Sequence, residues 1–131
     1  MESLKIKESK NHPEIDFNVS NGSLSITGKS IPEDTLRFYT PIKDWVKEYT
    51  SAPADETTVE LKFEYLNSSS NKCILDILEI LYNGISGDKK LKVNWYYSEE
   101  DILEDGEFLD TIAKIPFNFI EYEDEDEEFE L

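Results

Sequence analysis

The chain has little of what several classes of protein need. It has one cysteine among 131 residues, so it cannot form an internal disulfide, and one histidine. No stretch approaches the roughly 20 consecutive apolar residues that a membrane span requires. The N-terminus has no apolar run of signal-peptide length. We therefore expect a cytoplasmic protein that is neither a disulfide scaffold nor a membrane protein.

Basic residues are also scarce. The chain has 13 Lys and Arg against 30 Asp and Glu, which gives a formal net charge of −17 at pH 7. Proteins that bind nucleic acid need a basic surface, and an anionic membrane surface attracts basic segments. We therefore expect neither nucleic acid nor a membrane as a partner. Eight of the acids lie in residues 121–131, which contain no Lys or Arg, so residues 1–120 keep a charge of −9.

Signatures of catalysis are missing as well. The chain has no glycine-rich phosphate loop, dinucleotide fingerprint, G-x-S-x-G elbow or Cys/His metal spacing. His12 stands beside a proline without a second ligand or nucleophile nearby, which is typical of a surface loop. Cys73 is expected to be a small, partly buried side chain, with a reactive thiol near a helix N-terminus as the alternative. We expect no enzyme, no cofactor and no metal.

The most informative stretch that is present joins a strand to a helix. Apolar and charged residues alternate from Val59 to Tyr65, which predicts a strand with one buried face. Apolar residues then recur at helical spacing from Ile74 to Ile85. The polar joint between them reads Asn67-Ser68-Ser69-Ser70-Asn71-Lys72. A side chain there can cap the helix, and the free N–H groups of the first turn would equally accept a phosphate.

Further strands are predicted on both sides of this unit. They are expected at residues 4–7, 15–19, 24–27, 91–97 and 115–120. Ser20-Asn21-Gly22 predicts a hairpin turn between the second and third of these strands, since Asn-Gly favours the positive φ of tight turns. Pro116 places the last strand at an edge of the sheet.

Further helices are predicted from spacing and caps. We expect a helical turn over residues 33–39 and then a main helix from Thr40 to Tyr49, with one kinked helix as the alternative, because Pro41 disfavours a helix interior. Trp45 and Tyr49 are expected in the core. The helix after the joint should end at Asn83-Gly84 or Ser86-Gly87, because glycine favours the left-handed C-terminal position.

A last helix is expected from Glu99 to about Leu109. Ser98 is its predicted cap, and Ile102, Leu103 and Phe108 are predicted to face inward.

The half-polar strands decide the architecture. A sheet covered on both faces would have continuously apolar strands, whereas Glu60, Lys62 and Glu64 need water on one side. The sequence thus predicts an α/β fold with a mixed sheet, helices mainly on one face, an N-terminal β-hairpin and a right-handed βαβ unit. The domain is expected to span residues 1–120. The acidic tail, residues 121–131, is expected to be disordered, and its spacing does not match a calcium-binding EF-hand loop.

Four segments in the same order resemble the SiaC-like family of bacterial regulatory phosphoproteins. They cover nearly the whole chain short of the acidic tail. The segments are Pro13–Phe17 with Gly22–Gly28, Phe38–Pro41 with Trp45 and Tyr49, Tyr65–Lys72, and Val93–Tyr97. The resemblance implies a STAS-like domain, similar to anti-sigma-factor antagonists.

The resemblance also implies a function. In such systems a protein kinase phosphorylates a hydroxyl at the strand–helix joint, and a PP2C-type phosphatase removes the phosphate. The unphosphorylated form binds and activates its target, which in SiaC-like systems is a diguanylate cyclase that feeds cyclic-di-GMP and biofilm signalling. Carried over by position, the acceptor is Ser68, with Ser69 as the second candidate and Asn67, Ser70, Asn71 and Lys72 as its surroundings. The family often has Thr in that slot, which puts the preference of the kinase in question.

The sequence also fits a second class of function. The charge of −17 is compatible with an acidic binding module that mimics nucleic acid or inhibits a basic partner protein. Such binding would weaken steeply as ionic strength rises.

Overall fold

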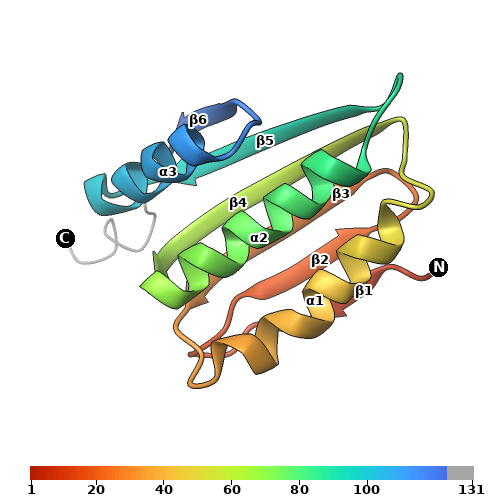
Figure 1. Cartoon of the computed structure of the whole chain (residues 1–131). Helices are drawn as coiled ribbons and strands as arrows, with labels where there is room; N and C mark the ends of the chain where they lie inside the picture. The colour runs from red at the N-terminus through yellow and green to blue at the C-terminus, as the bar shows by residue number, and fades with distance from the viewer. Residues whose placement is uncertain (124–131) are drawn as a thin grey trace.

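The structure is a computed structural model that describes residues 1–123. Strands and helices alternate through most of the chain, and Figure 1 shows the three helices on one side of the sheet. The elements are β1 (Leu4–Ile6), β2 (Glu14–Asn18), β3 (Ser23–Ser30), α1 (Thr35–Tyr49), β4 (Glu56–Leu66), α2 (Ser68–Gly84), β5 (Lys90–Tyr97), α3 (Glu100–Ile112) and β6 (Phe117–Glu121). No helix within residues 1–123 has the length and apolar character needed to cross a membrane.

The strands are arranged across the sheet in the order of the sequence, β1-β2-β3-β4-β5-β6. β1 pairs with β2, and β2 with β3, in antiparallel fashion, whereas the pairs β3–β4, β4–β5 and β5–β6 are parallel. Parallel neighbours need a crossover connection, and α1, α2 and α3 supply the three crossovers. The predicted mixed sheet and the parallel pairing within the βαβ unit are therefore confirmed, as is the edge position of the last strand.

The hairpin between β2 and β3 is confirmed, but its turn is wider than expected. The strands pair from Asn18 opposite Ser23, so four residues connect them. Gly22 has a φ of 72°, whereas no residue other than glycine within residues 1–123 has a positive φ. Asn21 therefore does not take part in a two-residue turn of the expected kind. Instead, the Asn18 side chain accepts hydrogen bonds from the backbone of the loop.

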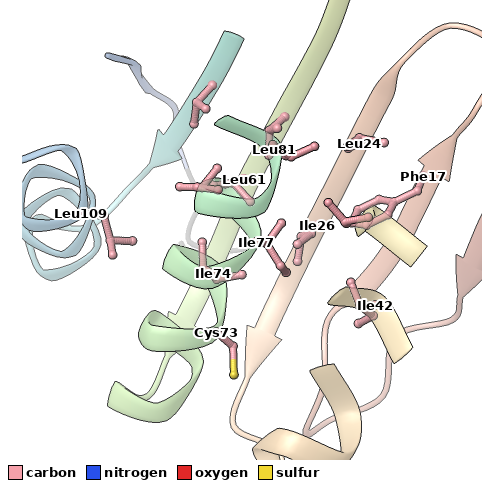
Figure 2. Close-up of a cluster of buried hydrophobic side chains, with 14 of the residues drawn as sticks. Phe17, Leu24, Ile26, Ile42, Leu61, Cys73, Ile74, Ile77, Leu81 and Leu109 are labelled. Atoms are coloured by element: carbon pink, nitrogen blue, oxygen red, sulfur yellow. The ribbon is translucent and has the colours of Figure 1, made fainter. Parts of the chain in front are cut away.

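The core lies between the helices and one face of the sheet. Ile74, Ile77 and Leu81 of α2 are at most 2% exposed and face the strands, where Ile26 and Leu61 meet them (Figure 2). On β4 the intervening residues are partly or fully exposed, as the alternation of the sequence predicted. Coverage of a single face of the sheet is therefore confirmed.

α1 is one continuous helix, so the predicted break before Thr40 is wrong, and the single helix of the alternative is confirmed. Asp34 caps the helix by accepting a hydrogen bond from the backbone N–H of Arg37 at 3.1 Å. Pro41 lies inside the helix but is exposed. Its ring removes the hydrogen bond to the carbonyl of Arg37, which lies on an exposed residue and can bind water instead. Tyr49 is fully buried, and Trp45 stacks on it while its indole N–H donates to the carbonyl of Glu2.

Tyr65 is exposed, although the alternation placed it on the buried face. The register of β3 and β4 shifts between Gly28 and Lys29, which pair with Phe63 and Tyr65 respectively. The extra residue on β4 is a bulge, and a bulge reverses the facing of the residues after it. As a result Tyr65 is 54% exposed, and Leu66 takes the buried position at 4%.

The ends of α2 and α3 differ from the prediction. α2 ends at Gly84, as one of the two alternatives proposed, but the positive φ of 71° belongs to Gly87 in the loop after the helix. α3 begins one residue later than expected, and its N-cap residue is Glu99 rather than Ser98. Glu99 makes no side-chain capping bond. Acids at Glu100 and Asp101 instead complement the helix dipole.

Phe108 was predicted to face inward but is 64% exposed. The buried face of α3 carries Ile102, Gly106 and Leu109. Gly106 lies so close to the sheet that a Cβ atom there would be 2.4 Å from the indole nitrogen of Trp95. That nitrogen donates to the carbonyl of Ile102 at 2.9 Å. This contact sets the rotation of the helix and turns Phe108 away. The predicted tail lies mostly outside the described residues.

Gly106→Ala should lower the free energy of unfolding by about 1–3 kcal/mol, as overpacking of a tight core does. The added methyl group would push against Trp95, and no flexible side chain can give way. Glu107→Ala, on the exposed neighbour, is the matched control. Urea unfolding followed by tryptophan fluorescence measures both, and equal stability of the two variants would contradict the assigned contact.

Candidate functional site

The site is the joint between β4 and α2. β4 ends at Leu66, Asn67 is extended with φ −83° and ψ 172°, and α2 begins at Ser68. The side-chain oxygen of Asn67 accepts a hydrogen bond from the backbone N–H of Ser70 at 2.8 Å. Asn67 is therefore the cap, and none of the three serines is needed for that role.

Ser68 and Ser69 occupy the first two positions of α2, and both are exposed. The side-chain hydrogen bonds of the joint are made by Asn67 and Ser70 instead. The first turn of a helix has unpaired backbone N–H groups and the positive end of the dipole. Both hydroxyls thus lie where an enzyme can reach them and where an added negative charge is stabilised.

Ser70 is different, because it is fully buried. Its hydroxyl donates to the carbonyl of Ser30 at 3.1 Å and accepts from the hydroxyl of Ser30 at 2.8 Å. The hydroxyl oxygens of Ser30 and Tyr39 are 2.6 Å apart. Since both Ser hydrogens are used, Tyr39 is the donor to Ser30. A kinase cannot reach Ser70 in this fold, so the candidate acceptors are Ser68 and Ser69.

Tyr39 has a strongly shifted pKa. Burial raises the pKa of its phenol to about 12, and the hydrogen bond to Ser30 opposes part of that rise. The side chain is fully buried, so the neutral phenol is the form that the network holds at all ordinary pH values. This network, which we call the Ser70 network (Ser30, Tyr39 and Ser70), ties α2 to β3 and α1.

The remaining predicted surroundings face different neighbours. Lys72 is exposed one turn after Ser68. Asn71 is half-buried and lies near Asp105 of α3. Burial raises the pKa of the Asp105 carboxyl, and the Asn71 side chain opposes part of that rise. The side-chain oxygen of Asn71 is buried and has no hydrogen-bond partner within residues 1–123. The joint is therefore in contact with α3 as well as with α1 and β3.

The cysteine and the histidine behave as expected. Cys73 is 3% exposed, and burial raises the pKa of its thiol despite the nearby Lys43, which supports the expectation of a buried side chain over a reactive one. Lys43 itself pairs with Asp76 at 2.9 Å, linking α1 to α2. His12 stacks on Phe38 at the surface, with ring centroids 4.7 Å apart.

Sequence reasoning missed Ser30 and Tyr39 as parts of the site. Ser30 is 40 residues from Ser70 in sequence, so no local spacing joins them. The sequence did contain one indication of this role. Ser30 falls in the same alternation as Leu24, Ile26 and Gly28, whose positions along β3 face the core. A polar residue in an inward phase needs a buried partner.

Comparison with known proteins places this site in context. A sequence model of the SiaC family of regulatory phosphoproteins matches residues 6–122. The crystal structure of apo-SiaC from Pseudomonas aeruginosa is 27% identical and superposes with a TM-score of 0.82, covering 92% of this chain and 99% of that one. A diguanylate cyclase, SiaD, has been solved in complex with its activator SiaC from the same organism; here the match is 28% identical with a TM-score of 0.81, over 91% and 99% of the chains.

One relative is also found by sequence. An uncharacterized protein of Pseudomonas aeruginosa strain UCBPP-PA14 is 29% identical over 101 residues, which is 77% of this chain and 80% of that protein. The fold and these matches define the class of protein, which is a family of regulatory phosphoproteins with an α/β fold whose helices cover one face of the sheet. More narrowly, the chain belongs to the SiaC family.

Asn67→Ala should lower the free energy of unfolding by about 1 kcal/mol, the usual loss when a helix cap is removed. Ser69→Ala, two positions on and exposed, should change it by less than about 0.5 kcal/mol. Urea unfolding of both variants compares them directly. A larger loss for Ser69→Ala than for Asn67→Ala would show that the cap is wrongly assigned.

The raised pKa of Tyr39 predicts a loss of stability at high pH. Unfolded tyrosine releases its proton near pH 10, whereas folded Tyr39 keeps it until about pH 12. Between these values the unfolded state binds fewer protons, so the free energy of unfolding falls as pH rises, by about 2–3 kcal/mol from this group.

Tyr39→Phe lacks this contribution. The stability difference between wild type and Tyr39→Phe should therefore shrink by that amount between pH 9 and pH 12. Ser69→Ala, at an exposed position without an ionisable side chain, is the control, and its difference from wild type should not vary with pH. A pH-independent difference for Tyr39→Phe would contradict the burial of a neutral phenol.

Proposed function

We propose that this protein is a partner-switching regulator controlled by reversible phosphorylation of Ser68. The unphosphorylated form binds and activates a target, a diguanylate cyclase, and thereby acts on cyclic-di-GMP and biofilm signalling. A protein kinase and a PP2C-type phosphatase act on Ser68, and the protein itself catalyses no reaction. Membership of a family of regulatory phosphoproteins supports this proposal, as does the structure of a 28% identical relative bound to its cyclase.

The observation that carries the choice of site is the division of roles within the joint. Asn67 caps the helix and Ser70 is buried, so the exposed hydroxyl of Ser68 has no structural task. Ser69 shares its exposure and is the second candidate. The position of Ser68 directly after Asn67 corresponds to the acceptor slot of the family pattern, which is why Ser68 is preferred.

The physical effect of the phosphate depends on its position. It adds roughly −1.5 to −2 charges and three acceptor oxygens. The N-terminus of α2 can hold these oxygens with free N–H groups, and Lys72 lies one turn further on. The fold therefore tolerates the modification. The target does not, because a charged group takes the place of a small hydroxyl in the contact surface.

Phosphosite mapping by mass spectrometry on protein from its native cells tests the site. Phosphate on Ser68 is the expected result, and phosphate on Ser69 would move the switch by one residue. If neither serine carries phosphate under any growth condition, Ser68 and Ser69 serve only as the first residues of α2, and control by phosphorylation is excluded.

Variants at Ser68 test the switch itself. Ser68→Ala should bind the cognate cyclase as tightly as the unmodified protein, while Ser68→Asp should weaken binding by roughly tenfold or more, because a misplaced buried charge costs several kcal/mol. Ser69→Ala and Ser69→Asp are the matched pair on the neighbouring hydroxyl. Calorimetric titration measures all four, and equal affinities of the two Ser68 variants would refute the proposal.

Ionic strength separates the proposal from the acidic binding module. The acidic binding module relies on exposed charges, and these are screened beyond about 8 Å at 0.15 M salt. Affinity that falls steeply with added NaCl and does not change when Ser68 is substituted would therefore favour the module. Binding that depends on Ser68 and only weakly on NaCl favours the switch.

A further inference from the structure

β6 leaves one edge of the sheet open. It is the last strand in the order of the sheet and pairs with β5 alone among the strands of residues 1–123, and Figure 1 shows it at the rim. Alternate residues of a parallel strand bond to the same neighbour. Because the backbone N–H of Tyr122 donates to the carbonyl of Tyr97 at 3.0 Å, Asn118 and Ile120 also bond toward β5. The backbone groups that point to the open edge are those of the remaining residues, Phe117, Phe119 and Glu121.

Only one end of this edge is blocked. The backbone N–H of Phe117 donates to a carboxylate oxygen of Asp110 at 3.0 Å. The N–H and the carbonyl of Phe119 have no such partner within residues 1–123. An edge with unpaired backbone groups is a template for pairing with another chain.

The other edge of the sheet is protected in the usual way. β1 has three residues with Lys5 in the middle, and short edge strands and lysines both discourage pairing. β6 has five residues and no Lys or Arg, and three of the five are large apolar residues that are partly exposed, namely Phe117, Phe119 and Ile120. β6 therefore needs another means of protection.

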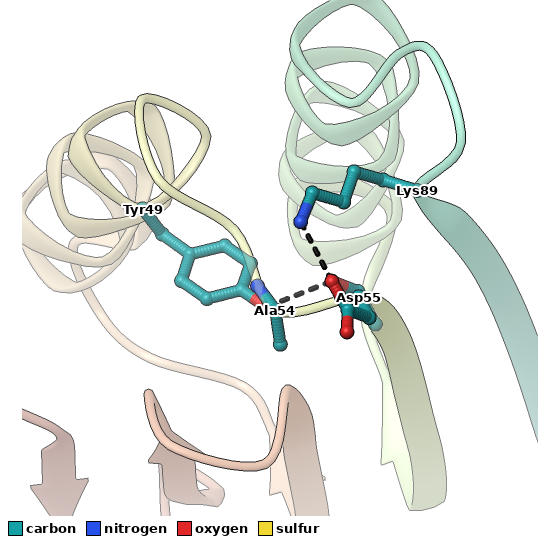
Figure 3. A network of polar contacts seen from close by, with 5 residues as sticks. Tyr49, Ala54, Asp55 and Lys89 are labelled. Atoms are coloured by element: carbon teal, nitrogen blue, oxygen red, sulfur yellow. Dashed lines mark hydrogen bonds and ion pairs between the residues drawn. The ribbon is translucent and has the colours of Figure 1, made fainter.

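Carboxylates surround the open edge of β6. Asp110 lies at its first N–H, Glu121 is its last residue, and Glu123 follows. The ion pairs within residues 1–123 include none of these acids. In contrast, Asp55, before β4, pairs with Lys89, before β5, at 2.7 Å (Figure 3). The acids near β6 thus lack the compensation that acids elsewhere receive.

The sequence concentrates acids in this part of the chain. Residues 99–131 contain 15 acids and one base, Lys114. Six of these acids belong to residues 124–131, which lie outside the described part of the chain but follow β6 directly in sequence.

Two copies could pair through this edge about a two-fold axis. Such symmetry places the same patch of both copies face to face, so the two β6 strands would run antiparallel. With Phe119 opposite the Phe119 of the second copy, each N–H would donate to the carbonyl of the other. Glu121 would then lie opposite Phe117 of the second copy and close to Asp110, which bonds to that residue. We propose that repulsion between these carboxylates, together with the acids that follow β6, keeps the edge from pairing with a second copy.

The position of the charge is decisive. Fields from exposed charges are screened beyond about 8 Å at physiological salt, so the net charge of −17 does not by itself protect one strand edge. Carboxylates must stand next to the edge. Two variants of equal net charge should therefore differ in self-association according to where their acids were removed.

Neutralising the acids next to β6 tests this in the full-length chain. The edge variant carries Glu121→Gln, Glu123→Gln, Asp124→Asn, Glu125→Gln and Asp126→Asn. The matched control loses the same number of charges at exposed acids on other parts of the surface, through Glu14→Gln, Glu33→Gln, Asp44→Asn, Glu48→Gln and Glu64→Gln.

Analytical ultracentrifugation compares both variants with wild type. The edge variant should dimerise at least about tenfold more tightly than wild type or the control, since like charges opposite one another at an interface oppose association. An edge variant that stays monomeric, or that associates no more than the control, would refute the proposal. So would a wild type that already dimerises through β6.

Hydrogen exchange and a proline locate the contact. In the wild type, the amide of Phe119 should exchange faster than those of Asn118 and Ile120, and in the dimer of the edge variant it should become protected. Glu121→Pro, in place of Glu121→Gln, removes an outward N–H without a loss of pairing to β5 and should return the dimer affinity toward that of the wild type. An unprotected Phe119 amide, or a dimer that forms equally well with Glu121→Pro, would place the contact elsewhere and refute the proposal. These measurements do not depend on phosphorylation of Ser68.

Discussion

Hydrogen bonds of the buried hydroxyl of Ser70 fix the beginning of α2 to the end of β3. The hydroxyl bonds to both the side chain and the carbonyl of Ser30, and Tyr39 completes the set from α1. α2 thus meets β3 and α1, which precede it by 30 to 40 residues, at one buried point. The bulge in β4 contributes to this arrangement, because it pairs Ser30 with Leu66 and buries both. The first turn of α2 is consequently anchored to β3, and Ser68 lies at the start of a helix rather than in a loop.

The two faces of the sheet differ in polarity. Three helices cover one face of six strands, and the opposite face keeps a ladder of polar contacts, in which Asn118 bonds to Asn94 and Asn94 bonds to Glu60. A sheet of this kind places the ends of its parallel strands, and the helices that come after them, along one edge. The joint after β4 lies at that edge, which explains why a surface hydroxyl and a buried network can be neighbours there.

Much of the fold could be predicted from the sequence, because periodicity records burial directly. The alternation in β4 and β5 and the apolar stripe of α2 specified a one-sided α/β sheet with a parallel unit. The predictions that failed depended on contacts between distant segments. Tyr65 comes after a bulge that only the pairing with β3 defines, and Phe108 is turned out by the contact of Gly106 with Trp95. For the candidate site, the joint and its exposed serines were predictable, whereas the Ser70 network required the tertiary structure.

The size of the charge that a phosphate adds argues for a local mechanism. The chain already carries −17, so a further charge of about −2 changes the total by roughly a tenth. Fields from exposed acids beyond about 8 Å are screened at physiological salt, so most of the surface charge does not sense the modification. A switch based on net charge would therefore be weak. The first turn of α2 differs from the rest of the surface because its free N–H groups would orient a phosphate on Ser68, as proposed, and because hydrogen bonds of Ser70 hold its immediate surroundings in place. A change of two charges can decide between binding and release only at such a position, where the partner must contact the modified atom itself.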